Sequence, residues 1–262
     1  MPDDANSEPV LLQATQNGIA TLTLNRPGKA NTLSESLMDA LEDAIGQAQS
    51  DDQVRVVVIA ASGKIFCAGH DLAEMQTRNQ GRNSKAYFEE LFARCSRLML
   101  AIRNARIPVI AKVQGAAVAA GCQLVAACDL AYAADKAKFG VNGINLGLFC
   151  STPSVALSRA VLPKKALELL LTGKLSSAPE AAEMGLINAA VPAAELARTV
   201  AEVAASIADK ETEAIMIGKS LFYRQLGLPE TEAYEMAGEC MARNIGMDAA
   251  RALIEEFISG AK

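Results

Sequence analysis

The chain contains no tryptophan and one histidine, and aromatic residues make up only 4% of its 262 residues. A single histidine, His70, excludes the paired histidines of most zinc sites, and no His/Asp/Glu cluster in the sequence predicts any other metal site. No GxGxxG or GxxxxGK[ST] loop is present, so neither a dinucleotide fold nor a P-loop is predicted. The GxSxG motif is also missing, so a hydrolase triad could form only around His70.

An excess of positive charge is missing as well, since the net charge is −5 and the pI is about 5.1. Nucleic-acid binders neutralise phosphates with lysine and arginine, so we expect no nucleic-acid partner. Residues 1–9 have neither an apolar signal core nor an Arg-rich amphipathic pattern. The cysteines have no CxxC spacing and mostly lie in apolar runs: Cys67, Cys95, Cys122, Cys128, Cys150 and Cys240. This pattern favours reduced thiols over a disulfide framework, and it predicts a cytoplasmic location.

No apolar run is long enough to predict a membrane span. The most apolar stretch, residues 107–134, is interrupted by Lys112, Gln114, Gln123 and Asp129. It therefore predicts buried α/β core. With 51% hydrophobic residues, the chain is long enough for one large domain or one and a half.

The first half of the chain alternates predicted strands with predicted helices. Asn17-Gly18 lies between two β-rich segments and is a strong hairpin signal. Ser34 is expected to cap a helix that runs to about Gln49. Residues 76–84 are polar and predict a loop before a long helix to about Asn104. Strands are predicted at residues 10–15, 19–25, 54–61, 109–113, 131–134 and 137–139.

From Ser151 onward the pattern is almost wholly helical, and patterning alone predicts an α/β region followed by helices. A proline in the first turn marks one helix start at residues 176–180. The last helices carry apolar positions that need burial, such as Ile215, Leu221, Met236 and Met241, so we expect an oligomer. The other helices are predicted at residues 151–161, 164–171, 195–208, 211–225, 230–245 and 248–258.

Two glycine-containing stretches carry most of the functional information. Lys64–Met75 includes Ala68-Gly69-His70-Asp71, and Gly115–Leu124 includes Ala119-Ala120-Gly121. Each stretch follows a β-branched run, passes through small residues and leads into a predicted helix. Helix N-termini of this kind leave unpaired N–H groups that bind a negatively charged oxygen. Two of them aimed at one point would form an oxyanion hole for a thioester carbonyl, although tight strand–helix packing explains either stretch alone.

Together with two further motifs, these stretches resemble the crotonase (enoyl-CoA hydratase/isomerase) superfamily from about residue 10 to the C-terminus. Asn25–Leu33 is similar to the family's loop beside coenzyme A, and Cys128–Ala131 followed by Lys138–Gly140 completes the set. The resemblance implies an α/β fold. A ββα spiral core with the acyl-CoA site is expected over residues 1–205, and a helical trimerisation region over 206–262. It also implies a coenzyme A thioester as substrate, no cofactor or metal, and a homotrimer or hexamer.

The resemblance places the two oxyanion donors at the backbone N–H groups of His70 and Ala120. The implied substrate-binding residues are Lys29, Ala30, Ala68, His70, Asp71, Leu72, Ala73 and Ala120. Small neighbours let the backbone approach the ligand, so valine at Gly69 or Gly121 is expected to weaken acyl-CoA binding in a chain that still folds.

The family's two catalytic glutamates match Gln123 and Gly143, and neither residue is a carboxylate. An amide can orient water but cannot take its proton, and glycine has no side chain. General acid–base catalysis typically contributes roughly 10²–10⁴ in rate, so poor hydration of enoyl-CoA is predicted. Changing both positions to glutamate is expected to raise hydratase activity.

Several residues near these motifs have more than one interpretation. The ring of His70 is a possible base, but we expect it to point away from the thioester. Asp71 is expected to cap the following helix, and Glu74 faces either the acyl pocket or solvent. Cys122 and Cys150 flank the expected pocket and are interpreted as packing residues, because no cationic neighbour activates them.

Two functions fit these residues. The first is an enoyl-CoA hydratase-like enzyme, a lyase of fatty acid metabolism, that works through the oxyanion hole with a base other than the usual glutamates. The second is an acyl-CoA-binding or regulatory protein without efficient turnover. Both need the same N–H groups, so the oxyanion motifs do not separate them.

Overall fold

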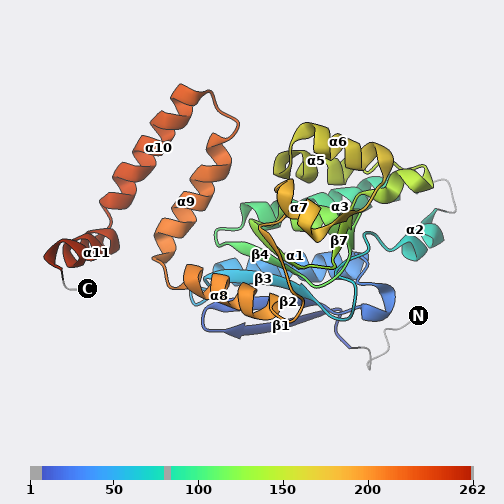
Figure 1. Ribbon diagram of the computed structural model, residues 1–262, viewed down its shortest axis with the longest axis horizontal. Helices are drawn as coiled ribbons and strands as arrows, with labels where there is room; N and C mark the ends of the chain where they lie inside the picture. The colour runs from blue at the N-terminus through green and yellow to red at the C-terminus, as the bar shows by residue number, and fades with distance from the viewer. Residues whose placement is uncertain (1–7, 80–83, 261–262) are drawn as a thin grey trace.

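The computed structural model describes residues 8–79 and 84–260, which form two β-sheets surrounded by helices (Figure 1). The larger sheet has the strand order β1-β2-β3-β4-β6-β9, and the smaller sheet has the order β5-β7-β8. The strands are β1 (Leu11–Gln16), β2 (Ile19–Leu24), β3 (Val56–Ala61), β4 (Val109–Val113), β5 (Ala117–Val118), β6 (Leu130–Ala134), β7 (Lys138–Gly140), β8 (Ser176–Ser177) and β9 (Ala189–Val191).

The larger sheet begins with the predicted hairpin. β1 and β2 pair antiparallel, and both turn residues, Asn17 and Gly18, have positive φ angles of 51° and 75°. This is the conformation that a two-residue hairpin turn requires. From β2 onward, each neighbouring pair in this sheet is parallel. β3 and β4 are buried almost throughout, as their continuous apolar sequences predict.

Helices cover both faces of this sheet. α1 (Glu35–Ser50) buries Leu37, Leu41 and Ile45, and the hydroxyl of Ser34 accepts the N–H of Leu37 as the predicted cap. The long helix α3 (Ser84–Asn104) packs beside α1, and α8 (Leu196–Ala208) packs against the opposite face of the sheet. The remaining helices around the core are α2 (Leu72–Arg78), α4 (Ala120–Ala127), α5 (Ser151–Ala160), α6 (Pro163–Thr172) and α7 (Ala178–Glu183).

The structure differs from the predicted elements at two places. The region after Ser151 was expected to be almost wholly helical, but it also contributes β8 and β9, and β9 pairs with β6 as the last strand of the larger sheet. Strands of two or three residues are too short to show a hydrophobic period. The prediction of a loop at residues 76–84 is partly wrong, because α2 continues to Arg78. Residues 80–83 lie outside the described chain.

The last three helices project from the body of the molecule (orange to red in Figure 1). α9 (Thr212–Gln225) packs on α10 (Glu230–Ile245), and α11 (Asp248–Ser259) follows, with no buried residue in any of the three. Their exposed side chains include Phe222, Met241 and Phe257. No helix in residues 8–79 and 84–260 is both long and apolar enough to span a membrane. The expected division at residues 205 and 206 stays a prediction.

Candidate functional site

The two glycine-containing stretches lie side by side, although about 50 residues separate them in the sequence. Cys67 and Ala117 form a parallel β-bridge. The N–H of Cys67 donates to the carbonyl of Ala116 (3.1 Å), and the N–H of Val118 donates to the carbonyl of Cys67 (3.0 Å). These bonds fix the chain just before each expected donor. The two stretches, Lys64–Met75 and Gly115–Leu124, are called the first and second donor segments below, and the bonds hold them against one another.

Beyond this bridge, Gly69 and Ala119 also bring the two segments close together. Gly69 has a φ angle of +93°, and Ala119 has a φ angle of +49°, which is unusual for a residue with a Cβ. A Cβ on Gly69 would lie 3.3 Å from the backbone nitrogen of Ala120. The small residues predicted from the sequence therefore do bring the backbone of one motif to the donor of the other.

The N-terminus of α4 has no side-chain cap, since Ala119 occupies the capping position. Ala120 is only 1% exposed, yet within residues 8–79 and 84–260 its N–H has no acceptor. The N–H of His70 also has none in the described chain. Buried backbone N–H groups are almost always paired, so an uncapped buried helix start is a place where an anionic oxygen can bind.

Gly121 has a different role from the one expected. A Cβ on Gly121 would overlap the carbonyl oxygen of Cys67, which itself accepts the N–H of Val118. Valine at Gly121 must therefore disrupt the bridge between the segments. The overlap counts against the expectation that such a variant still folds, which stays a prediction.

The ring of His70 packs edge-on against Phe92 of α3, with 5.5 Å between the ring centroids. Both ring nitrogens are buried, and neither makes a hydrogen bond within the described residues. Burial lowers the pKa of the imidazole below its ordinary value, and the nearby backbone of Leu33 offsets this only in part. At neutral pH the ring is therefore uncharged.

The loop expected beside coenzyme A contacts the first donor segment directly. Its tip is a short 3₁₀ helix, Pro27–Lys29, and the side chain of Lys29 is exposed. Ala30, which has a φ angle of +50°, accepts the N–H of Ala68 through its carbonyl (3.1 Å). The structure thus places the loop that carries Lys29 and Ala30 directly beside Ala68 of the first donor segment.

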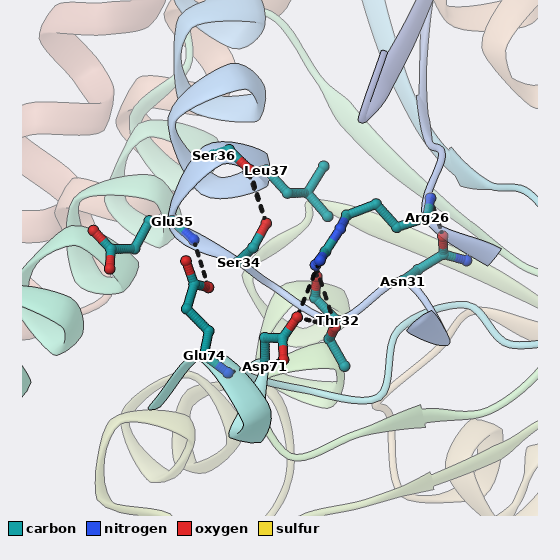
Figure 2. A network of polar contacts seen from close by, with 9 residues as sticks. All are labelled: Arg26, Asn31, Thr32, Ser34, Glu35, Ser36, Leu37, Asp71 and Glu74. Carbon is teal, nitrogen blue, oxygen red and sulfur yellow. Dashed lines mark hydrogen bonds and ion pairs between the residues drawn. The ribbon is translucent and has the colours of Figure 1, made fainter. Parts of the chain in front are cut away.

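The two carboxylates after His70 are both engaged (Figure 2). Asp71 accepts the N–H of Glu74 (3.3 Å), which confirms its predicted role as the cap of α2. Glu74 was expected to face either the acyl pocket or solvent; its side chain is half-buried, and the choice between the two stays a prediction. Its carboxylate accepts the N–H of Glu35 at the start of α1 (3.2 Å), and burial raises its pKa. The expected substrate contacts Leu72 and Ala73 are exposed on α2.

Gln123 is buried on α4, one turn after Ala120. Its side-chain oxygen lies 3.9 Å from the Sγ atom of Cys95 on α3, which is placed to donate its thiol hydrogen. The sequence gave no sign of this contact, because Cys95 lies in a helix far from any motif. The amide oxygen therefore meets Cys95 across the contact between α3 and α4.

Gly143, which the resemblance places at the second acid–base position, lies in the short 3₁₀ helix Asn142–Leu146. A Cβ there would lie 2.7 Å from the carbonyl oxygen of Leu148 and 2.8 Å from the Sγ atom of Cys150. The N–H of Leu148 also donates to the carbonyl of Gly143 (3.0 Å). Glutamate at this position would require these neighbours to move, so the expected double replacement cannot simply restore the family's pair.

All six cysteines are free thiols, as predicted. Burial raises the pKa of Cys67, Cys95 and Cys122 to about 12, and it also raises the pKa of Cys150. These shifts are opposite to those of a reactive cysteine, so the thiols act as packing groups. Among the described residues, no group of three His, Cys, Asp or Glu side chains could hold a metal ion.

Comparison with known proteins places these features in one family. The sequence model of the enoyl-CoA hydratase/isomerase family matches residues 14–256. The chain is 43% identical to enoyl-CoA hydratase domain-containing protein 3, mitochondrial, of Rattus norvegicus, over 98% of this chain and 85% of the relative. An enoyl-CoA hydratase structure from Mycobacterium smegmatis has a TM-score of 0.92 at 49% identity, covering 97% of both chains. The structure of human enoyl-CoA hydratase domain-containing protein 3 has a TM-score of 0.91 at 41% identity, covering 96% of this chain and 98% of that one.

These similarities confirm the resemblance and the crotonase-type fold with its helical C-terminal region. Residues 121–126 and 147–153 predict the same two groups of relatives, the domain-containing protein 3 and its bacterial counterparts. The cytoplasmic location is contradicted, because the rat, mouse and human relatives are all named as mitochondrial. Unpaired thiols indicate a reducing environment and do not identify the compartment, which is why that prediction went too far.

Proposed function

Because the chain belongs to the enoyl-CoA hydratase/isomerase family, we propose that it binds an acyl-CoA or enoyl-CoA thioester between the N–H groups of His70 and Ala120. One observation supports this proposal most strongly. Ala120 is buried, its N–H has no acceptor among the described residues, and it starts a helix without a cap. A thioester oxygen supplies the acceptor that this helix start lacks.

The same two groups favour chemistry at the acyl α-carbon. When a thioester becomes an enolate, negative charge gathers on the carbonyl oxygen. The positive end of the α4 dipole and the N–H of His70 then bind the oxygen more tightly than in the ground state. This differential binding is what lowers a barrier, so the site is suited to an enoyl-CoA hydratase-like lyase reaction that needs no cofactor.

The groups that usually move the protons are replaced. Gln123 accepts from the thiol of Cys95 across the contact between α3 and α4, and the carbonyl of Leu148 and the thiol of Cys150 lie close to Gly143. These contacts favour a second candidate function, which is acyl-CoA binding without efficient turnover. Under either function the donors and the thioester are the same.

Mass spectrometry of a mixed acyl-CoA and enoyl-CoA panel incubated with the protein separates the two functions, because it assumes no reaction in advance. We expect thioesters to bind more tightly than free coenzyme A in calorimetric titration. A product peak that exceeds the protein-free control supports the enzyme, and binding without a product peak supports the acyl-CoA-binding protein. If neither thioesters nor coenzyme A bind, both functions are contradicted.

We further propose that the protein forms a homotrimer, or a hexamer made of two trimers. α9, α10 and α11 carry exposed apolar side chains, among them Phe222, Met241 and Phe257, and none of their residues is buried within one chain. A second and third copy would cover these helices. Light scattering at micromolar concentration tests the proposal, and a monomer would contradict it.

A further inference from the structure

On one side, the first donor segment is hydrogen-bonded to the loop that precedes α1. The N–H of Leu33 donates to the carbonyl of Gly69 (2.8 Å), and the N–H of Asp71 donates to the carbonyl of Leu33 (3.4 Å). Successive backbone groups of an extended chain point to opposite sides. The N–H of His70, which lies between these two bonds, therefore points away from Leu33 and towards the side left open for a ligand.

The side chain of Arg26 ties the same loop to Asp71 (Figure 2). Its Nη1 atom donates to the carbonyl (2.8 Å) and the hydroxyl (3.3 Å) of Thr32, and its Nη2 atom donates to Asp71 Oδ2 (3.0 Å). The hydroxyl of Thr32 donates to the same carboxylate oxygen (3.3 Å). The guanidinium thus joins the loop before α1 to Asp71.

The other end of the loop is fixed just as firmly. Asn31 is fully buried and accepts the backbone N–H of Arg26 through Oδ1 (2.8 Å). Its Nδ2 atom donates to the carbonyls of Ser62 and Ile65, both at 2.8 Å. Arg26 therefore projects from a rigid base, and its guanidinium holds Asp71 in a defined place.

The pair is largely shielded, with 19% of the Arg26 side chain and 13% of the Asp71 side chain exposed. Burial alone would raise the pKa of Asp71, but the N–H of Glu74 and the guanidinium of Arg26 hold it below its ordinary value. Removing Arg26 would leave a shielded carboxylate without its counter-charge, next to the donor residue. The carboxylate would then rotate towards water and move the start of α2.

We propose that Arg26 is a positioning residue, which acts through Asp71 to set the direction of the His70 N–H towards the thioester oxygen. This inference rests on the proposed function. Arg26 does not touch the ligand. Its loss is expected to weaken the response of the donor to a thioester while leaving the binding of the rest of coenzyme A nearly unchanged.

His70 is the only histidine in the chain, so labelling with ¹⁵N-histidine gives one backbone amide signal, that of the proposed donor. In the wild type, saturating acetyl-CoA is expected to move this signal downfield more than free coenzyme A does. In Arg26→Met we expect the signal to be displaced before ligand is added and to respond less to acetyl-CoA. Acetyl-CoA should bind roughly tenfold more weakly, about the effect of losing one good hydrogen bond, and free coenzyme A should bind within about twofold of the wild type.

Arg94→Met is the matched control, because Arg94 is 21% exposed and also forms ion pairs in the first turns of a helix, with Glu35 (3.4 Å) and Asp39 (2.8 Å) of α1. It should keep the wild-type amide position and response. Arg26→Lys retains a charge but loses the planar fork, so an intermediate response is expected, and this variant serves if the methionine variant does not fold. A folded Arg26→Met or Arg26→Lys with the full wild-type response overturns the inference. A wild-type signal that acetyl-CoA does not move, while the ligand is bound, instead contradicts the donor assignment on which the inference rests.

Discussion

Gly69 and Ala119 face one another at the junction of the two donor segments, where a Cβ on Gly69 would lie 2.9 Å from the Cβ of Ala119. Both residues have positive φ angles, and Ala119 keeps this conformation despite the strain on a residue with a side chain. Tight packing alone does not require strain at Ala119 beside an N–H that has no acceptor in the described chain. The arrangement holds the two backbone segments close together, next to the N–H of Ala120 that has no acceptor among the described residues.

Gly69→Ala is therefore expected to weaken acyl-CoA binding by roughly tenfold, the effect of about 1.4 kcal/mol, because the added methyl group would push against Ala119 and the nitrogen of Ala120. A positive φ angle also makes alanine at this position strained by about 1–3 kcal/mol, so a lower Tm is expected. Calorimetric titration with acetyl-CoA and thermal unfolding measure the two effects. A folded Gly69→Ala variant with unchanged acetyl-CoA affinity would sink the assignment.

Ala119→Gly supplies the control, since glycine adopts a positive φ angle without strain. Alone, it should bind acetyl-CoA as the wild type does and unfold at the same or a higher temperature. Combined with Gly69→Ala, it should recover part of the lost affinity because it removes one of the two clashing methyl groups. Failure of the double variant to recover any affinity would place the clash elsewhere.

The ring of His70 is expected to titrate below the ordinary histidine pKa of about 6.5, because burial disfavours its charged form. In the window between the lowered folded pKa and about 6.5, the unfolded chain binds more protons than the folded one. Stability contributed by the neutral ring is then fully present above about pH 6.5 and falls as the pH drops through the folded pKa. Side-chain NMR of the single labelled histidine gives the pKa directly, and a value above 6.5 would contradict the buried, uncharged ring.

His70→Gln separates the ring from the backbone. The variant keeps the donor N–H, so acetyl-CoA affinity should remain within about threefold of the wild type, a change of about 0.7 kcal/mol at most. The loss of stability between about pH 6.5 and the folded pKa should disappear. A variant that binds normally but loses all product formation would instead identify the imidazole as the missing base.

Gln123→Glu is expected to produce a small gain in crotonyl-CoA hydration over a wild type that is poor at it. The change restores one of the family's two glutamates. The new carboxylate must be desolvated beside Cys95, so the gain in rate should stay well below the roughly 10²–10⁴ of full acid–base catalysis. Gly143→Glu is not expected to add to it, because its side chain meets the Leu148 carbonyl. The hydration assay follows the loss of enoyl absorbance; efficient hydration by the unmodified protein would refute this account of the site.

Lys219 is expected to hold the projecting helices to the core. Its Nζ atom donates to Asp129 Oδ2 (2.7 Å) and to the carbonyl of Ile107 (3.0 Å), while the hydroxyl of Tyr223 donates to Asp129 Oδ1 (2.8 Å). Lys219→Met should lower the free energy of unfolding by about 3 kcal/mol, because it leaves the shielded carboxylate without its cation. Lys165→Met, which breaks an exposed pair with Glu168, should cost less than about 1 kcal/mol. Equal losses in chemical denaturation would show that the Asp129 pair does not anchor α9.

The sequence predicts those parts of the fold that local physics decides. Asn17-Gly18 can form only a tight hairpin, Ser34 and Asp71 have the side chains that cap helices, and the continuous apolar runs of β3 and β4 need burial on both faces. The short strands β8 and β9 escape prediction because two or three residues carry no period.

The candidate site divides in the same way. The donor roles of His70 and Ala120 come from the family resemblance and stay a prediction, although the small residues beside them could be read from the sequence. The partners of long side chains could not, because they depend on which elements meet in space. Glu74 reaches the start of α1 and Gln123 meets Cys95 of α3, and neither contact leaves a trace in the local sequence. The close contacts around Gly143 were hidden for the same reason.

The most direct test of the account is an experimental structure of the protein with a bound acyl-CoA. We predict that the thioester oxygen lies about 2.7–3.2 Å from the backbone nitrogens of both His70 and Ala120, the distance of N–H···O hydrogen bonds. The side chain of Arg26 should remain on Asp71, away from the coenzyme A phosphates. A well-ordered thioester whose oxygen contacts neither nitrogen would contradict the central claim.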